Sequence, residues 1–239
     1  MTGPKNHAPS VSVVIPVFNA TNVVQDAVDS VVKQTMPDWE LFLVDDGTTD
    51  GSDQSAKLKE IAASDPRIHV LQTTGRQGAG PARNMGMGAA KGRYIAFLDA
   101  DDMWHPQKLT LQRAAMETQN AVLSCTALTR INMTTGQQTD VGVPAKITRH
   151  SLLHTNVIAC SSAMFDRDHY GPRDMPALRR RQDFAFWLSL MTDGSHAIGI
   201  ATPLLTYREM PVSLSANKHR AARDTWTMYR QHLKMPFVQ

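Results

Sequence analysis

Short apolar runs alternate with helix-like segments along the N-terminal part of the chain, and this alternation limits the possible folds more than any other feature. The run Val11–Phe18 (VSVVIPVF) is rich in β-branched residues and nearly continuous in apolar character, which is typical of a strand buried on both faces of a parallel sheet. From Asn22, the expected N-cap, valines and alanines follow at helical spacing. Further strands are expected at 41–44, 68–71 and 94–98, with helices at 53–63, capped by Ser52 or Asp53, and at 81–90. This pattern predicts a doubly wound α/β fold with a mostly parallel central sheet and helices on both faces.

The pattern is less regular beyond Trp104. Helices are expected at 106–117 and 184–191, and strands at 121–124, within 157–165 and at 197–200. No linker or internal repeat divides the chain. We therefore expect residues 1–10 to be a flexible lead-in, residues 11–215 to form a single domain with halves 11–120 and 121–215, and residues 216–239 to form a C-terminal helical tail.

Composition and charge exclude several classes of protein. The chain has 239 residues, of which 42% are hydrophobic and 20% charged, so it can bury a large core and is not disordered. A net charge of +3 is too small to indicate a nucleic-acid partner, and none is expected. The N-terminus lacks the apolar region of a secretory signal, and no stretch is apolar enough to span a membrane. Cys125 and Cys160 lack the spacing of a metal or redox motif, so we expect reduced thiols. Together, the features of the sequence predict a cytoplasmic protein. We expect it to meet a membrane only peripherally, at the inner face of that membrane.

Aspartates follow two of the expected strands at the point where each strand ends. Asp45 and Asp46 come after the second strand, and Asp99, Asp101 and Asp102 come after the fourth. In open α/β sheets ligands bind outside the carboxyl ends of the strands, so both clusters should face one crevice. Carboxylates there suit Mg²⁺ or Mn²⁺ bridging a diphosphate, because a cation offsets their mutual repulsion. The alternative for any isolated pair is that the aspartates only form turns.

A glycine-rich loop precedes the expected helix at 81–90. Gly75, Gly78 and Gly80 could let a phosphate approach the helix N-terminus, where Arg83 lies one turn in. The dinucleotide fingerprint is absent, since Arg83 occupies the third glycine position, and no phosphate-binding GxxxxGK[ST] motif occurs. A merely flexible loop is the alternative.

Four motifs resemble those of the family 2 inverting glycosyltransferases, which have the GT-A fold. In chain order they are VSVVIPVFNA (11–20), LFLVDDGTTDGS (41–52), GPARNMGMGAAKGRYIAFLDADD (80–102) and RQDFAFWL (181–188). The resemblance extends from Val11 to about Ser215. It implies a Rossmann-like GT-A domain in which residues 11–120 bind the nucleotide-sugar and residues 121–215 bind the acceptor.

The resemblance also implies a role for individual residues, each at a position that matches a family motif. Six of these residues would bind the donor. Pro16 and Phe18 would line the nucleoside pocket, and Asp46, supported by Asp45, would recognise uracil. Arg83 would lie near the nucleotide, and Asp99 would contact the ribose. Asp101 would ligate Mn²⁺ or Mg²⁺. Asp183 would be the base that accepts the proton of the acceptor hydroxyl.

The activity so implied is a metal-dependent inverting transfer of a sugar from a nucleotide-sugar, with UDP favoured, to a hydroxyl of a bacterial glycan or lipid-linked acceptor. The chain lacks the QxxRW motif of processive synthases, so single transfers of the kind that build exopolysaccharide, capsule or lipopolysaccharide are expected. It departs from the family at Gln182, where the usual acidic pair begins with Glu. A sugar nucleotidyltransferase and a catalytically silent nucleotide-sugar-binding protein are the alternatives.

Two features have a structural alternative that the sequence leaves open. Asp183 could instead cap the following helix or pair with one of the arginines at 179–181. In the tail, Trp226, Tyr229 and Leu233 fall on one helical face amid basic residues. That face could lie on an anionic membrane that carries a lipid-linked acceptor, or it could pack on the core.

Overall fold

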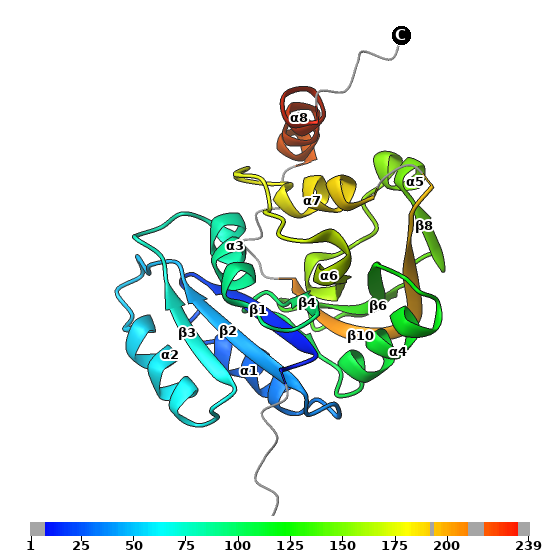
Figure 1. Ribbon diagram of the computed structural model, residues 1–239. Helices are drawn as coiled ribbons and strands as arrows, with labels where there is room; N and C mark the ends of the chain where they lie inside the picture. Colours follow the sequence, from blue (N-terminus) through cyan, green and yellow to red (C-terminus); the bar gives the residue numbers. More distant parts are fainter. Residues whose placement is uncertain (1–7, 192–193, 210–217, 234–239) are drawn as a thin grey trace, which may run out of the picture.

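The computed structural model describes residues 8–191, 194–209 and 218–233 (Figure 1). Its strands form a single sheet in the order β3-β2-β1-β4-β9-β6-β10-β5, with β7 added beside β6 and β8 beside β10. The strands are β1 (Val11–Val17), β2 (Trp39–Asp45), β3 (Ile68–Gln72), β4 (Tyr94–Phe97), β5 (Met103–Trp104), β6 (Leu123–Asn132), β7 (Gln138–Val141), β8 (Lys146–Thr148), β9 (Met164–Asp166) and β10 (His196–Glu209). The α/β fold and mostly parallel sheet predicted from the sequence are confirmed.

Helices cover both faces of this sheet, as predicted. They are α1 (Val24–Val32), α2 (Gln54–Ala63), α3 (Ala79–Ala89), α4 (Lys108–Thr118), α5 (Arg149–His154), α6 (Arg167–Tyr170), α7 (Gln182–Leu190) and α8 (Lys218–Thr227), with a 3-10 turn η1 (Cys160–Ser162) and a π-helical turn η2 (Met228–His232). One core cluster joins the sheet to α1, α2 and α4. A second joins its other face to α3, α5 and α7 (Figure 1).

The N-terminal strands are parallel and buried on both faces. Val13 of β1 is paired with Leu41 of β2 on one side and with Ala96 of β4 on the other, and all three side chains are fully buried. Local capping is partly as expected: Asp53 accepts a 2.9 Å hydrogen bond from the backbone N–H of Ala56 at the start of α2. The prediction for Asn22 is wrong, because α1 begins one residue later, after Val23, without a side-chain cap.

The second half of the sheet is built from longer strands than the sequence indicated. The strand expected at 197–200 extends to Glu209, and the strand expected at 121–124 extends to Asn132. β10 runs parallel to β6 through two register shifts around Pro203. Proline is tolerated at such an irregularity, so Pro203 interrupts the apolar run of β10 without ending the strand.

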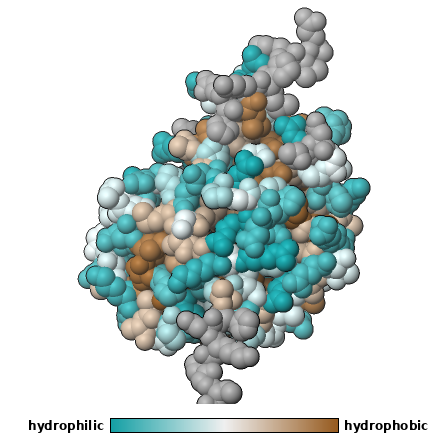
Figure 2. Space-filling view, in the orientation of Figure 1, coloured by the Kyte–Doolittle hydropathy of each residue, from teal (hydrophilic) through white to brown (hydrophobic). Residues whose placement is uncertain are grey.

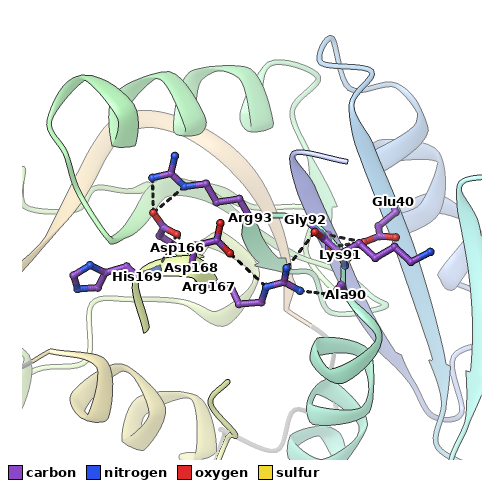
Figure 3. Close-up of polar contacts among 10 residues, drawn as sticks. Glu40, Ala90, Lys91, Gly92, Arg93, Asp166, Arg167, Asp168 and His169 are labelled. Carbon is purple, nitrogen blue, oxygen red and sulfur yellow. Dashed lines mark hydrogen bonds and ion pairs between the residues drawn. The ribbon is translucent and has the colours of Figure 1, made fainter. Parts of the chain in front are cut away.

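A polar network fixes the end of the sheet opposite the aspartate clusters (Figure 3). The buried carboxylate of Glu40 accepts hydrogen bonds from the backbone N–H groups of Lys91 at 2.6 Å and Gly92 at 3.3 Å. A Cβ on Gly92 would lie 2.6 Å from the backbone nitrogen of Ser12, so only glycine fits this turn. Arg93 pairs with Asp166 at 2.7 Å and thereby ties β4 to β9. These contacts hold the start of β4 and so determine where its carboxyl end lies.

The C-terminal helices pack on the body of the molecule through part of the predicted face. Met228 is fully buried, and the Tyr229 hydroxyl donates a 2.5 Å hydrogen bond to the carbonyl of Leu153. Leu233 also packs against the core, whereas Trp226 is 55% exposed. Apolar residues reach the surface near this junction (Figure 2). Residues 1–7 of the expected flexible lead-in and residues 216–217 and 234–239 of the tail lie outside the described parts of the chain.

None of the helices in the described parts of the chain is long and apolar enough to cross a bilayer.

Candidate active site

Asp46 organises the loop that leads into α3. Its Oδ1 accepts a 2.8 Å hydrogen bond from the backbone N–H of Gln77, and its Oδ2 accepts a 2.7 Å bond from that of Gly78. Gly78 has φ +99°, a conformation that favours glycine. Asp45 is bonded to Gln54 Nε2 at 2.7 Å. The paired aspartates at the end of β2 therefore hold the surrounding backbone, and both are buried.

Pro16 and Phe18 lie at the end of β1, beside the aspartates of β2. Pro16 is opposite Val44 in the sheet register, and both Pro16 and Phe18 are half-buried. The guanidinium of Arg76 lies 4.1 Å above the centre of the Phe18 ring. At this distance the cation stacks directly on the aromatic face, and the two groups together form one flat surface on which a planar, polar ring could pack. Arg76 was not among the residues that the sequence indicated.

Arg83 is a buried cation with spare hydrogen-bond donors. Its Nη2 donates to Asp99 Oδ1 at 2.5 Å, which links α3 to the segment that follows β4. Within the described residues, its Nε and Nη1 are buried and have no partner. Nearby Cys160, Asp99 and Asp183 raise the pKa of Arg83 against the effect of its burial. Buried N–H donors without acceptors are costly, so an anionic or hydroxylated ligand would complete this group.

Asp183 also lies near Arg83, in the first turn of α7. The N-cap of α7 is Arg181, which has φ +63°, so Asp183 does not cap this helix. Burial raises the pKa of Asp183, while the charge of Arg83 opposes that rise. Arg180 pairs with Asp224 at 3.5 Å. The charge that most affects Asp183 comes from Arg83 of α3, and a backbone hydrogen bond at Phe184 and the charge of Arg181 also lower its pKa.

Asp101 and Asp102 occupy different environments although they are adjacent. Asp102 is buried: its Oδ2 accepts a 2.6 Å hydrogen bond from Ser161 Oγ, and its Oδ1 accepts a 3.1 Å bond from the backbone N–H of Arg208. Asp101 is half-buried. Burial, together with the charge of Asp99, raises the pKa of each of these two carboxyl groups. Negative charge is therefore crowded at the end of β4.

This carboxylate group fits a divalent cation that is shared with a substrate. In the part of the chain that the structure describes, no three His, Cys, Asp or Glu side chains converge to hold a metal ion unaided. Mg²⁺ and Mn²⁺ are well suited to oxygen ligands, and Mg²⁺ is commonly bound by one or two carboxylates plus substrate phosphates. Asp101 and Asp99 can provide the carboxylates, and a cation would reduce the repulsion that raises the pKa of Asp101.

The predicted site residues fall into two groups. Arg83, Asp99, Asp101 and Asp183 gather around the end of β4, whereas the others surround the ends of β1 and β2. The loop at 77–78 links the groups, because Asp46 holds it and it leads directly into α3. The residues that sequence reasoning missed are Arg76, in the loop before α3, Ser161, in the turn η1, and Arg208, in β10, and none of them belongs to a spacing pattern.

The chain is similar over nearly its whole length to bacterial glycosyltransferases. The sequence profile of the protein family described as Glycosyl transferase family 2 matches residues 12–171. The putative teichuronic acid biosynthesis glycosyltransferase TuaG of Bacillus subtilis (strain 168) is 38% identical over 236 residues, which cover 98% of this chain and 92% of TuaG. Escherichia coli WfgD, described as a UDP-Glc:alpha-D-GlcNAc-diphosphoundecaprenol beta-1,3-glucosyltransferase, is 32% identical over 233 residues, covering 96% of this chain and 88% of WfgD.

Solved structures of glycosyltransferases share the fold. Staphylococcus aureus TarS 1–349 in complex with UDP-GlcNAc superposes with a TM-score of 0.70 at 19% identity, over 87% of this chain and 61% of that one. The mannosyltransferase PcManGT of Pyrobaculum calidifontis, in complex with GDP-Man and Mn²⁺, gives a TM-score of 0.64 at 17% identity, over 98% of this chain and 67% of that one. The predicted GT-A fold is confirmed. The family match, with relatives this similar along the whole chain, shows that the protein is a glycosyltransferase and belongs to glycosyl transferase family 2.

Proposed function

We propose that the enzyme transfers a sugar from a UDP-sugar to a hydroxyl of a lipid-linked bacterial glycan, with inversion at the anomeric carbon and with help from Mn²⁺ or Mg²⁺. The observation that carries the proposal is the position of Arg83. This buried cation contacts Asp99 and lies near Asp183, and its free N–H donors face no acceptor within the described residues. A nucleotide-binding carboxylate, a cation for the departing diphosphate and a base would thus share one small volume.

The nucleoside would bind where β1 and β2 end. Phe18 and Arg76 offer a surface for the uracil ring, with Pro16 beside them. Asp46 would accept a hydrogen bond from uracil, since a carboxylate has about four acceptor positions and loop N–H groups use only part of them. Asp45 would support Asp46 through its bond to Gln54. Recognition of UDP by WfgD, as its name states, agrees with this assignment.

The diphosphate would bind near the end of β4. Asp99 would contact the ribose, and Asp101 would hold the divalent cation. When bound, the cation would neutralise the charge that develops on the departing diphosphate. Arg83 would add its unpartnered N–H groups on the same side, where burial strengthens their interaction with an anion.

Asp183 would act as the base. The acceptor oxygen forms a bond to the anomeric carbon as the bond from that carbon to the diphosphate oxygen breaks, and the hydroxyl proton passes to the Asp183 carboxylate. Attack from the face opposite the leaving group inverts the configuration, so no covalent enzyme intermediate is needed. The Arg83 charge favours the ionised form of Asp183 despite its burial, which keeps it able to accept a proton.

The acceptor would be attached to a lipid and reached at the inner face of the membrane. WfgD is named for a diphosphoundecaprenol acceptor. In this chain Trp226 and Arg223 are exposed on the C-terminal helix while Met228 anchors the adjoining turn in the core. Exposed tryptophan and basic residues favour contact with an anionic bilayer surface. Sedimentation with vesicles containing anionic lipid tests this contact, and equal binding of the wild type and Trp226→Ser would refute the role of Trp226.

The test of the proposed function is a donor panel with wild type and Asp101→Asn. UDP-sugars, a GDP-sugar and free UDP are screened with Mn²⁺ by thermal shift, and sugar release or transfer is then measured. A ligand at a hundred times its Kd stabilises the fold by about 2.7 kcal/mol. We expect UDP-sugars to stabilise the wild type, and Asp101→Asn to lose turnover without losing the fold. Stabilisation by the GDP-sugar alone, or full turnover with a chelator present, would refute the assignment. Asp168→Asn, at an exposed position, is the matched control.

A further inference from the structure

Ser161, in η1, contacts the segment that carries Asp101 at several points. Its Oγ accepts a 3.0 Å hydrogen bond from the backbone N–H of Asp99 and donates a 2.6 Å bond to Asp102 Oδ2. Its carbonyl oxygen accepts a 2.7 Å bond from Trp104 Nε1. Ser161 is only 2% exposed, so water does not compete for these bonds. One residue, distant in the sequence, therefore fixes the backbone on both sides of Asp101.

Arg208 of β10 holds the same segment from the other side. Its backbone N–H donates to Asp102 Oδ1 at 3.1 Å, and its side-chain Nε donates to the carbonyl oxygen of Asp101. Its Nη1 pairs with Asp26 of α1 at 2.7 Å. Asp102 thus lies between Ser161 and Arg208 with both carboxylate oxygens bonded. The backbone of Asp101 has little freedom, while its own carboxylate remains half-buried at the end of β4.

We propose that Ser161 is a positioning residue that sets the divalent-cation affinity of Asp101. The inference rests on the proposed function, in which Asp101 holds the cation. Loss of the Ser161 hydroxyl would leave the backbone N–H of Asp99 and the Oδ2 of Asp102 without their buried partner. The segment would then shift to recover hydrogen bonds, and the Asp101 carboxylate would move with it. Loss of a residue that orients a metal ligand typically costs 10-fold to 100-fold in metal affinity.

The neighbouring Ser162 provides a matched control. It is fully buried, as Ser161 nearly is, and its Oγ donates a 2.7 Å hydrogen bond to the carbonyl of Ala159, within the same turn. Its carbonyl accepts from Gln112 of α4. Ser162→Ala therefore removes a buried hydroxyl of the same kind without touching the segment at 99–104. A purely structural role for Ser161 predicts that the two alanine variants behave alike.

The experiment measures Mn²⁺ binding directly. Free Mn²⁺ is followed by its electron paramagnetic resonance signal as the ion is titrated into the full chain with saturating UDP. We expect Ser161→Ala to bind Mn²⁺ at least about tenfold more weakly than the wild type, with a parallel rise in the Mn²⁺ concentration for half-maximal transfer. Ser162→Ala should bind within about twofold of the wild type, although both variants lose some thermal stability. Equal Mn²⁺ affinity in the two variants would overturn the role of Ser161.

Further variants separate this inference from the function on which it rests. Asp101→Asn should abolish UDP-dependent Mn²⁺ binding. If the wild type itself binds no Mn²⁺ with UDP, the proposed metal site is wrong, and the inference is overturned with it. If the wild type binds Mn²⁺ and Ser161→Ala does not fold, Ser161→Cys takes its place, because a thiol has similar size but donates weakly. Ser161→Cys should also weaken Mn²⁺ binding, and wild-type affinity in that variant would overturn the inference.

Discussion

The substitution Asp183→Asn separates catalysis from stability at the candidate base. Asparagine has nearly the same shape and cannot take up the proton of an acceptor hydroxyl. General base catalysis contributes on the order of a hundredfold to ten-thousandfold in rate. A hundredfold loss corresponds to about 2.7 kcal/mol in the activation barrier. We therefore expect the transfer rate to fall at least about a hundredfold while donor affinity stays near that of the wild type.

The structure predicts a much smaller effect on folding. Asp183 lies in the first turn of α7 rather than at its N-cap, so asparagine loses the interaction of a negative charge with the helix N-terminus, about 0.3–1 kcal/mol, together with the attraction between that charge and Arg83. Burial raises the pKa of Asp183, which means that the ionised form weakens the fold as pH rises through that pKa, and a neutral amide removes this cost. The effects oppose each other. For a chain of this size 1 kcal/mol shifts Tm by roughly 2–4 °C, so Tm should change by no more than that.

Kinetics at several pH values complete the assay. Because the wild-type base must be ionised, kcat/KM should fall as pH falls through the raised pKa of Asp183, and Asp183→Asn should lack this acid limb. Asp168→Asn, at an exposed position, is the control and should transfer normally. Transfer by Asp183→Asn at more than a tenth of the wild-type rate would refute the reasoning. The base would then lie elsewhere, with Asp102 and Asp174 as the next residues to test.

Two further predictions concern the fold. Lys108 is buried against the Trp104 ring, with its Nζ 4.0 Å from the centre of the ring. Burial lowers the pKa of Lys108 to about 7. Above pH 7 the folded chain therefore releases a proton that the unfolded chain still binds. Between pH 7 and 9 the free energy of unfolding of the wild type should therefore rise relative to that of Lys108→Met, by up to about 1.4 kcal/mol per pH unit. Urea unfolding measures both free energies at each pH, and an equal dependence on pH in the two proteins would contradict this prediction. In α3, a Cβ on Gly86 would lie 2.4 Å from Val14 Cγ1, whereas one on Gly88 would meet nothing within 4 Å. Gly86→Ala should destabilise the protein by about 1–3 kcal/mol and Gly88→Ala should leave it unchanged or stabilise it slightly, so a similar Tm for both variants would show that α3 packs differently.

The features of the fold that were predicted correctly are those determined by residues close together in the sequence. The buried run of β1 and the cap at Asp53 are local, and residue pattern alone indicates them. Asn22 shows how limited such evidence is, because a good capping residue lies next to the helix without capping it. The reach of β10 past Pro203 depends on β6, its partner across the sheet, and no local pattern shows it.

The candidate site was predicted less completely, since it joins distant segments. Resemblance to a family indicated Arg83, Asp99 and Asp183, and the structure brings Arg83 and Asp99 into contact. The aromatic residues that follow Asp183 in α7 are buried in the core. Ser161 and Arg208 surround Asp101 by tertiary contacts, which a single sequence does not reveal.

The short strand β9 limits when the two halves of the sheet can be joined during synthesis. It lies between β4 and β6 and runs antiparallel to both, with Tyr94 paired to Asp166. The pairing of β1 with β4 joins Val11 to Tyr94, and the pairing of β4 with β9 joins Tyr94 to Asp166, so β4 closes a long loop on each side. Closing such a long loop costs entropy before the contact is gained, and nonlocal pairings of this kind slow folding. A chain emerging from the ribosome therefore presents β1 to β4 before β9, and the two halves of the sheet can be joined through β4 only once β9 has been synthesised.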